Sequence, residues 1–282
     1  MSELENRTVI GIDRGASFTD FGVVKSGRLI DKASLEKRDW DSICNTYNRL
    51  NRKYQAETSV FTGSISEMPD ALKQSVQVIS EIDAVGFGGS WSAGFDECIV
   101  VSIGTGSAIV HFANNRTRHM GGTGVGGGTI KGLCALMCNL HDHAEIEASA
   151  LKGNPSLLNL TISDLGYESI SFLGSDITAS NFAAVKSKRI EDLAAAILRL
   201  VGETVGIIAS LCAREAGCMH KIVIVGKVAQ NRYIRHTLEL VGKLYQTHFV
   251  FPENPGYATV YGTAIKAEFD RLERSKNSMP SS

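Results

Sequence analysis

The sequence predicts an α/β protein of two lobes with a duplicated core, and two observations lead to this prediction. First, short apolar segments alternate with helical patterns along most of the 282 residues, as in sheets that are covered by helices. Second, TVIGIDRGAS from Thr8 and CIVVSIGTGS from Cys98 share one pattern, an apolar strand followed by a glycine turn with hydroxyl side chains. Because each segment can open one half of a duplicated protein, we expect a first lobe over residues 1–95 and a second over 96–282.

Local patterns define the elements in chain order. A strand from Thr8 is followed by a hairpin that turns near Ser26 and Gly27. Apolar residues at helical spacing, among them Trp40, Ile43 and Leu50, predict a helix over 39–55. Further on we expect helices over 67–75, 129–140, 190–216, 233–245 and 264–274, and buried strands over 58–63, 97–103 and 221–226. The closing helix, Ala264 to Arg274, is expected to pack back on the first lobe.

The bulk composition excludes several classes of protein. The formal net charge of −1 provides no basic field for nucleic acid or a membrane surface. We expect no membrane span, because no apolar run reaches about 18 residues, and no signal peptide, because the N-terminal stretch is polar. The six cysteines form no CxxC pair. Together these features predict a cytoplasmic protein with reduced thiols.

The first glycine turn, Gly11 to Ser17, is a candidate metal and phosphate site. Asp13 stands at the end of an apolar strand, and Gly15 and Ser17 follow in the turn. Such a turn leaves backbone N–H groups free for phosphate, and the carboxylate can hold Mg²⁺ through water. A purely structural turn is the alternative.

The second candidate is a glycine-rich segment that holds nine of the chain's 28 glycines between Val101 and Leu133. Glycine is costly to order, so a cluster of this size requires a physical reason. Two turns with interleaved hydroxyls suit a polyphosphate, and the second turn opens a helix whose N-terminus favours anions. Two tight hairpins are the alternative. The candidate phosphate-binding residues are Gly104, Thr105, Gly106, Gly124, Gly126, Gly127, Gly128 and Thr129.

These turns, in this order, resemble the acetate kinase, hexokinase and actin-type ATPase superfamily, and most closely the type II pantothenate kinases. The matching segments are GIDRGAS (11–17), EIDAVGFGG (81–89), VSIGTGSAIVHF (101–112), GGTGVGGGTIKGL (121–133), SDITASNFAAV (175–185), GETVGIIASLCARE (202–215) and PGYATVYGTAIKA (255–267). The resemblance implies an actin-like, ribonuclease H-like fold with a nucleotide cleft between the lobes. It also implies ATP and Mg²⁺ as cofactors, a homodimer, and transfer of the γ-phosphate of ATP to the hydroxyl of pantothenate, the first step of coenzyme A biosynthesis.

The resemblance assigns roles to individual residues. Glu81 takes the position of the general base, and we expect its apolar surroundings to desolvate it and raise its pKa. Asp13 matches the Mg²⁺-associated aspartate. Thr178 and Ala179, in the DITASNF segment, belong to the substrate-binding residues.

Two positions depart from the family pattern. In the first turn, Ala16 and Ser17 replace a glycine and a threonine, and Asp20 stands where a phosphate-facing lysine is expected. These changes should weaken ATP binding, although an aspartate at this position also resembles the ATPase half of hydantoinase-type enzymes. At the substrate site, His119 replaces an arginine that holds the pantothenate carboxylate. Its neighbour Arg118 is a candidate contact, but neighbours on a strand point to opposite faces.

Three functions are therefore compared. The first is a kinase that acts on pantothenate or a related small molecule. The second is a divergent nucleotide-binding protein with little kinase activity, which Asp20 and His119 favour. The third is an activator ATPase with an iron–sulfur cluster, which would use Cys134 and Cys138 on one helix face. Two core thiols are the alternative for that pair.

Overall fold

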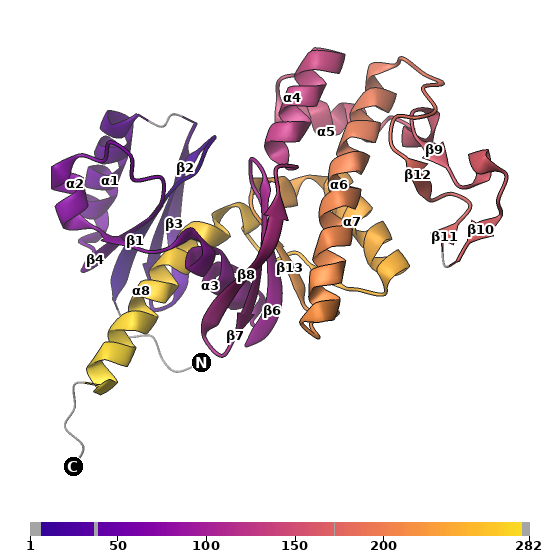
Figure 1. Cartoon of the computed structure of the whole chain (residues 1–282). Coiled ribbons are helices and arrows are strands. Elements are labelled where there is room, and N and C mark those ends of the chain that lie inside the picture. Colours follow the sequence, from indigo (N-terminus) through magenta and orange to yellow (C-terminus); the bar gives the residue numbers. More distant parts are fainter. Residues whose placement is uncertain (1–6, 37–38, 172, 278–282) are drawn as a thin grey trace.

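The computed structural model describes residues 7–36, 39–171 and 173–277, and it contains two five-stranded sheets (Figure 1). The first has the order β3-β2-β1-β4-β5 and the second the order β14-β13-β6-β7-β8. The strands of the first sheet are β1 (Thr8–Arg14), β2 (Thr19–Lys25), β3 (Arg28–Leu35), β4 (Thr58–Gly63) and β5 (Gln77–Val78). Those of the second are β6 (Glu97–Ile103), β7 (Ser107–Ala113), β8 (Arg116–Thr123), β13 (Ile222–Val225) and β14 (Phe249–Val250).

The two sheets have the same topology. In each, three strands form an antiparallel meander, and two later strands add in parallel to the first strand of the meander. β1 and β6, the strands that carry the two glycine turns, occupy equivalent places. The duplicated core predicted from the two sequence patterns is therefore confirmed.

Helices cover the outer faces of both sheets (Figure 1). On the first sheet, α1 (Trp40–Tyr54) and α2 (Asp70–Ser75) contribute Ile43, Leu50 and Leu72 to a core shared with Ile10 and Phe21. On the second sheet, the helices are α4 (Gly127–Cys138), α5 (His143–Ala150), α6 (Ile190–Glu215) and α7 (Arg232–Tyr245). The helices expected around 39–55, 129–140, 190–216 and 233–245 are thus confirmed within two residues at each end.

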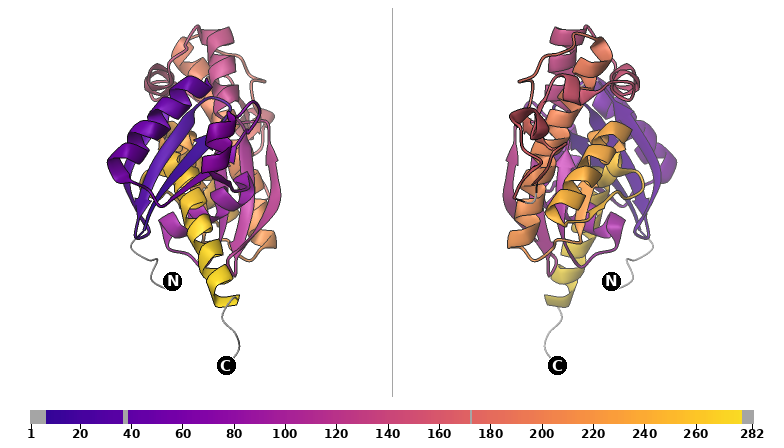
Figure 2. Two further views of the ribbon diagram at one scale, coloured as in Figure 1. Left: turned by 90° about the vertical axis from the view of Figure 1, so that its left-hand side faces the viewer. Right: turned by 90° about the vertical axis from the view of Figure 1, so that its right-hand side faces the viewer.

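Two further helices, α3 (Glu81–Ala93) and α8 (Ala258–Asn277), pack against each other between the sheets (Figures 1 and 2). Their core joins Val9 and Val60 of the first sheet to Val100 and Val223 of the second. α8 also contacts β1, β2 and β4, so the expectation that the closing helix returns to the first lobe is confirmed. It begins at Ala258, six residues earlier than predicted.

α6 qualifies the expectation that the chain has no membrane span. It is long and apolar enough, by length and composition, to cross a membrane, although charged residues such as Arg199 and Glu203 interrupt its apolar run. However, 56% of its apolar window is buried against the rest of the protein. Residues such as Ile197, Val201 and Val205 pack with the second sheet, α4, α5 and α7, so α6 is the central helix of the second lobe.

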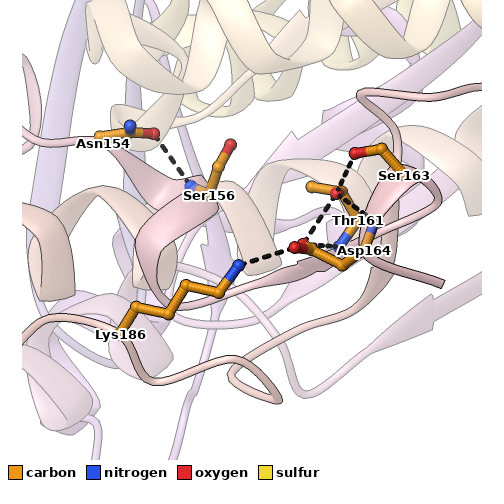
Figure 3. A network of polar contacts seen from close by, with 6 residues as sticks. All are labelled: Asn154, Ser156, Thr161, Ser163, Asp164 and Lys186. Atoms are coloured by element: carbon orange, nitrogen blue, oxygen red, sulfur yellow. Dashed lines mark hydrogen bonds and ion pairs between the residues drawn. The ribbon is translucent and has the colours of Figure 1, made fainter. Parts of the chain in front are cut away.

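A small irregular region lies beyond α5. It contains the short strands β9 (Leu160–Thr161), β10 (Ser169–Ile170), β11 (Leu173–Gly174) and β12 (Thr178–Ser180) and the 3₁₀ turns η1 (Pro155–Leu157) and η2 (Ser163–Leu165). Figure 3 shows its polar network: the Asp164 carboxylate accepts hydrogen bonds from Thr161 N at 3.0 Å and Lys186 Nζ at 2.7 Å. The Lys186 ammonium and the Thr161 donors lower the pKa of Asp164 to about 2. This ionised carboxylate ties Lys186 to the turn around Thr161.

Candidate active site

The first glycine turn places two carboxylates opposite each other. Asp13, near the end of β1, is the direct partner of Asp20 on β2 in the antiparallel register. Residues directly opposite on such strands point to the same face. The pKa of Asp13 is raised to about 8, mainly by burial and then by the charges of Asp20 and Glu81, whereas Lys227 lowers it. Three charged groups, from β2, α3 and the turn after β13, therefore lie within electrostatic range of Asp13.

Lys227 is the residue of this group that the sequence analysis did not single out. It follows β13 and opens the 3₁₀ turn η3 (Lys227–Gln230) in the second lobe. Its ammonium group lies 2.9 Å from Asp20 Oδ1 and donates a hydrogen bond of 2.6 Å to Ser34 Oγ. It also lies 3.6 Å from the centroid of the Phe18 ring, within the range of a cation–π contact. A cation therefore stands beside the first turn, although position 20 carries a carboxylate.

The first and second turns meet at two hydroxyl groups. Ser17 Oγ and Thr105 Oγ1 are 3.0 Å apart, and both residues are exposed. Ser17 belongs to the turn after β1, with Gly15 half-buried beside it, and Thr105 belongs to the turn between β6 and β7. The two halves of the duplicated core thus bring their turns together at the junction of the lobes.

The glycine-rich segment divides into residues that pack and residues that face open space. Gly127 N donates to Gly104 O at 2.7 Å, and Gly128 N donates to Thr105 O at 2.8 Å. A Cβ on Gly126 would lie 2.5 Å from Gly106 O, so the start of α4 rests directly on the second turn. By contrast, a Cβ on Gly104 or Gly124 would meet nothing within 4 Å.

These contacts give the residues at the start of α4 a packing role. The Gly126, Gly127 and Gly128 amides are already hydrogen-bonded, since Gly126 N donates to Thr129 Oγ1 at 3.2 Å. The Thr129 hydroxyl in turn donates to the Gly124 carbonyl. These four residues build the site by close packing, so their polar groups are not free donors for an anion. Of the candidate residues, Gly104, Thr105, Gly124 and Gly128 are exposed, whereas Gly106 is half-buried.

Glu81 is the first residue of α3. Ser80 caps this helix, because its Oγ accepts a hydrogen bond from Asp83 N at 3.1 Å. The Glu81 side chain is exposed, so the expected desolvation of this carboxylate was wrong. Its charge nevertheless acts on Asp13. Helix α3 therefore presents a solvated carboxylate to the cluster of Asp13, Asp20 and Lys227.

Arg118 and His119 lie on opposite faces of β8, as the alternation of strand residues predicts. Arg118 pairs with Glu215 at the end of α6, at 3.4 Å, and is therefore directed away from α3. His119 shares its face with Thr117, which donates a hydrogen bond to Asp83 on α3. Arg118 therefore lies apart from the cluster, and exposed His119 lies on the face toward α3.

Thr178 and Ala179 are not brought to the cluster. They belong to β12, which lies across α6 from the first sheet in Figure 1. Thr178 Oγ1 donates to Glu203 Oε1 at 3.0 Å, and Arg199 Nε donates to the same oxygen at 2.6 Å. Within one chain, these residues anchor the irregular region to α6.

The donor set beside Asp13 suits Mg²⁺. Asp13, Asp20 and Glu81 supply carboxylate oxygens, which are hard ligands of the kind this ion takes. Thr62, the parallel neighbour of Asp13 on β4, has a buried hydroxyl without a hydrogen-bond partner among the described residues. An unpartnered hydroxyl beside a carboxylate is a position for a metal-bound water. These residues therefore fit a hydrated Mg²⁺ ion.

Cys134 and Cys138 are both buried in the core of the second lobe. Burial raises the pKa of Cys134 to about 12, so its thiol is protonated and unreactive near neutral pH. All six cysteines are free thiols. The structure supports two core thiols over ligands of a cluster shared with a partner.

Known protein families provide an independent comparison for this chain. The Fumble family model matches residues 46–266, which is most of the chain. The chain belongs to the Fumble family, that of the type II pantothenate kinases. A type II pantothenate kinase of Bacillus cereus (strain AH820) is 24% identical over 273 residues, covering 92% of this chain and 98% of the relative. One of Staphylococcus epidermidis is 25% identical, covering 82% and 89%. The chain is accordingly a phosphotransferase of the kinase type.

Solved structures show the fold class. The activator of 2-hydroxyisocaproyl-CoA dehydratase from Clostridium difficile, with bound ADPNP, is similar with a TM-score of 0.65 at 17% identity, covering 98% of this chain and 99% of that one. A ROK family glucokinase from Streptomyces griseus, in complex with glucose and AMPPNP, gives 0.62 at 15% identity, covering 92% and 98%. The predicted actin-like, two-lobed fold is confirmed.

Proposed function

We propose that this member of the Fumble family transfers the γ-phosphate of ATP to the hydroxyl of pantothenate, or of a related pantetheine-like alcohol. The observation that carries the proposal is the gathering of Asp13, Asp20, Glu81 and Lys227 where Ser17 of one lobe meets Thr105 of the other. Phosphoryl transfer requires positioning and charge stabilisation more than covalent chemistry from the protein. This junction provides metal-binding carboxylates, a cation and hydroxyl-bearing turns together.

Each residue has a stated part in the proposed reaction. Ser17, Thr105 and the open backbone at Gly104 bind the phosphates of ATP between the turns. Asp13 holds Mg²⁺ through water, and the ion, when bound, neutralises charge on the phosphate oxygens. Lys227 adds a second positive charge, which Asp20 and Ser34 hold in place. Glu81 accepts the proton of the acceptor hydroxyl as the new phosphorus–oxygen bond forms and the bond from the γ-phosphorus to ADP breaks, which releases ADP.

Location and assembly follow from the same proposal. A kinase of a soluble metabolite is expected in the cytoplasm, and the family resemblance predicts a homodimer. The long apolar helix α6 is a candidate for the dimer interface, but most of its apolar side chains are buried in the core. A homodimer must therefore use other surfaces than the buried face of α6.

A coupled ADP-release assay tests the function directly. We expect pantothenate or pantetheine, but not glucose, to raise ADP formation above the rate with ATP alone. Glu81→Gln should lower this rate by about 10²–10⁴, which is the usual contribution of a general base, without changing ATP affinity. Glu239→Gln on α7, also an exposed glutamate, is the matched control and should leave the rate unchanged.

Two other results would contradict the proposal. A Glu81→Gln variant within a few-fold of wild type would remove the base assignment. Binding of MgATP without ADP release for any acceptor would instead favour a nucleotide-binding protein with little kinase activity, the candidate that His119 supports.

A further inference from the structure

A second group of metal-ligating side chains lies at the opposite end of the second sheet from the glycine turns. Glu97 is the first residue of β6, His111 lies near the end of β7, and Cys218 follows α6. Their ligand atoms all lie within 4.8 Å of one another, and His111 Nε2 is 3.3 Å from Glu97 Oε1. The seven residues of β6 separate this group from the second turn by about 20 Å, at about 3.3 Å per residue.

The backbone explains why these side chains converge. His111 is the direct partner of Ile99 in the β6–β7 register, so His111 and Glu97 are diagonal neighbours on one face of the sheet. Cys218 N donates to Ala213 O at 2.8 Å, and Lys221 N donates to Cys218 O at 2.9 Å. The same loop is tied to β6 by Ile99 N, which donates to Lys221 O at 3.0 Å. The strand pairing and these backbone hydrogen bonds thus hold the three ligand-bearing residues in place.

The three groups differ in burial in a way that suits one bound ion at the surface. Cys218 is buried, the His111 side chain is 17% exposed, and the Glu97 side chain is 52% exposed. A metal held by these atoms would be enclosed on the protein side and open to water on the other. The neighbouring charge in the loop is Lys221, whose ammonium group lies 5.9 Å from the Phe95 ring centroid.

The chemical types of the three ligands indicate which metal ion they would bind. A thiolate, an imidazole and a carboxylate are the ligands that Zn²⁺ takes, with water in a fourth position. Mg²⁺, by contrast, prefers oxygen ligands and keeps most of its waters. The candidate metal ligands among the residues proposed for phosphate transfer are oxygen atoms, so the two sites are expected to discriminate between the two ions.

We propose that Glu97, His111 and Cys218 form a zinc-binding site that fastens the β6–β7 hairpin to the loop between α6 and β13. On binding, the thiol of Cys218 releases its proton to solvent as the metal–sulfur bond forms. The site is independent of the proposed kinase reaction, because it shares no residue with it. Its expected effect is on the stability of the second lobe.

We choose Co²⁺ as the probe, because it binds at zinc sites and its absorption spectrum reports ligation by sulfur. Full-length protein is purified reduced and treated with chelator, and Co²⁺ is then added without nucleotide. We expect one equivalent to produce a near-ultraviolet thiolate charge-transfer band, which one equivalent of Zn²⁺ abolishes and excess Mg²⁺ does not. Zn²⁺ should also raise the melting temperature.

Variants connect these signals to the three residues. Cys218→Ser should lose the charge-transfer band, and His111→Gln and Glu97→Gln should lose the zinc-dependent rise in melting temperature. Cys212→Ser, a half-buried cysteine on α6, is the matched control and should behave as wild type. The absence of the band in wild type, or its persistence in Cys218→Ser, would overturn the proposal. A zinc-dependent rise in melting temperature as large in Glu97→Gln and His111→Gln as in wild type would likewise show that the ion binds elsewhere.

Discussion

The role inferred for Asp20 changes once its neighbours in the structure are known. In the sequence it replaces an expected lysine, and this charge reversal predicts weaker binding of ATP. In the structure its carboxylate holds the ammonium group of Lys227, whose side chain is 31% exposed. The positive charge beside the first turn is therefore retained, but it comes from the second lobe.

A charge test follows at this scale. Lys227→Met should remove the cation that pairs with Asp20 and acts on Asp13, and it should weaken MgATP binding about tenfold or more, since a charge-assisted hydrogen bond contributes about 1.5–3 kcal/mol. Asp20→Lys should not restore a family-like site, because it should place two ammonium groups together. We expect it to destabilise the nucleotide-free protein by about 1–3 kcal/mol. This cost is smaller than for a fully buried pair of like charges, because Lys227 is part-exposed.

Titration calorimetry and chemical denaturation measure these two effects. Lys32→Met is the control, because Lys32 also crosses to the second lobe, at Asn254, but is not paired with a carboxylate there. Equal losses of MgATP affinity in Lys32→Met and Lys227→Met would contradict a specific role for Lys227.

The sequence predicted much of the site, but not all of its partners. Asp13, Ser17, Thr105 and Gly104 were identified because strand-end turns with glycines and hydroxyls have a local signature. Lys227 was missed because its partner Asp20 lies in the other lobe, and only the signal GK after a buried strand marks it. The exposure of Glu81 also depends on the helix start, which local apolar composition does not determine.

At the scale of elements, α3 is the helix that local patterns did not reveal. Its sequence contains Gly86, Gly88 and Gly89, and glycine is the second-worst helix former after proline. The close crossing of α3 and α8 gives the reason: a Cβ on Gly88 of α3 would lie 2.0 Å from Ala258 O, and a Cβ on Gly262 of α8 would lie 2.0 Å from Ala84 O. The glycines allow α3 and α8 to cross at backbone contact between the sheets.

Gly88→Ala tests this contact. We expect it to lower the free energy of unfolding by about 1–3 kcal/mol or more, because the backbone of α8 must move away. Gly132→Ala is the matched control, since it also lies in a helix but its Cβ would meet nothing within 4 Å. That change should raise stability by about 0.5–1 kcal/mol. Similar unfolding curves for both variants would show that the helices do not require the close approach.

At the scale of the whole molecule, duplication explains where the site lies. Two sheets of the same topology each end their first strand in a glycine turn, and α3 and α8 hold the sheets so that the turns meet. The central claim is that the phosphates of ATP lie between these turns, against the open backbone of the second one. The lobes would then share one nucleotide.

Titration calorimetry with MgATP on the Gly104→Ala and Gly124→Ala variants tests this claim most directly. A Cβ at either position meets no protein atom within 4 Å, so the nucleotide-free variants should keep the wild-type melting temperature. If the phosphates occupy that space, at least one variant should bind MgATP about tenfold or more weakly, a loss of about 1.4 kcal/mol, while Gly132→Ala binds as wild type. Wild-type affinity in both Gly104→Ala and Gly124→Ala would contradict the account.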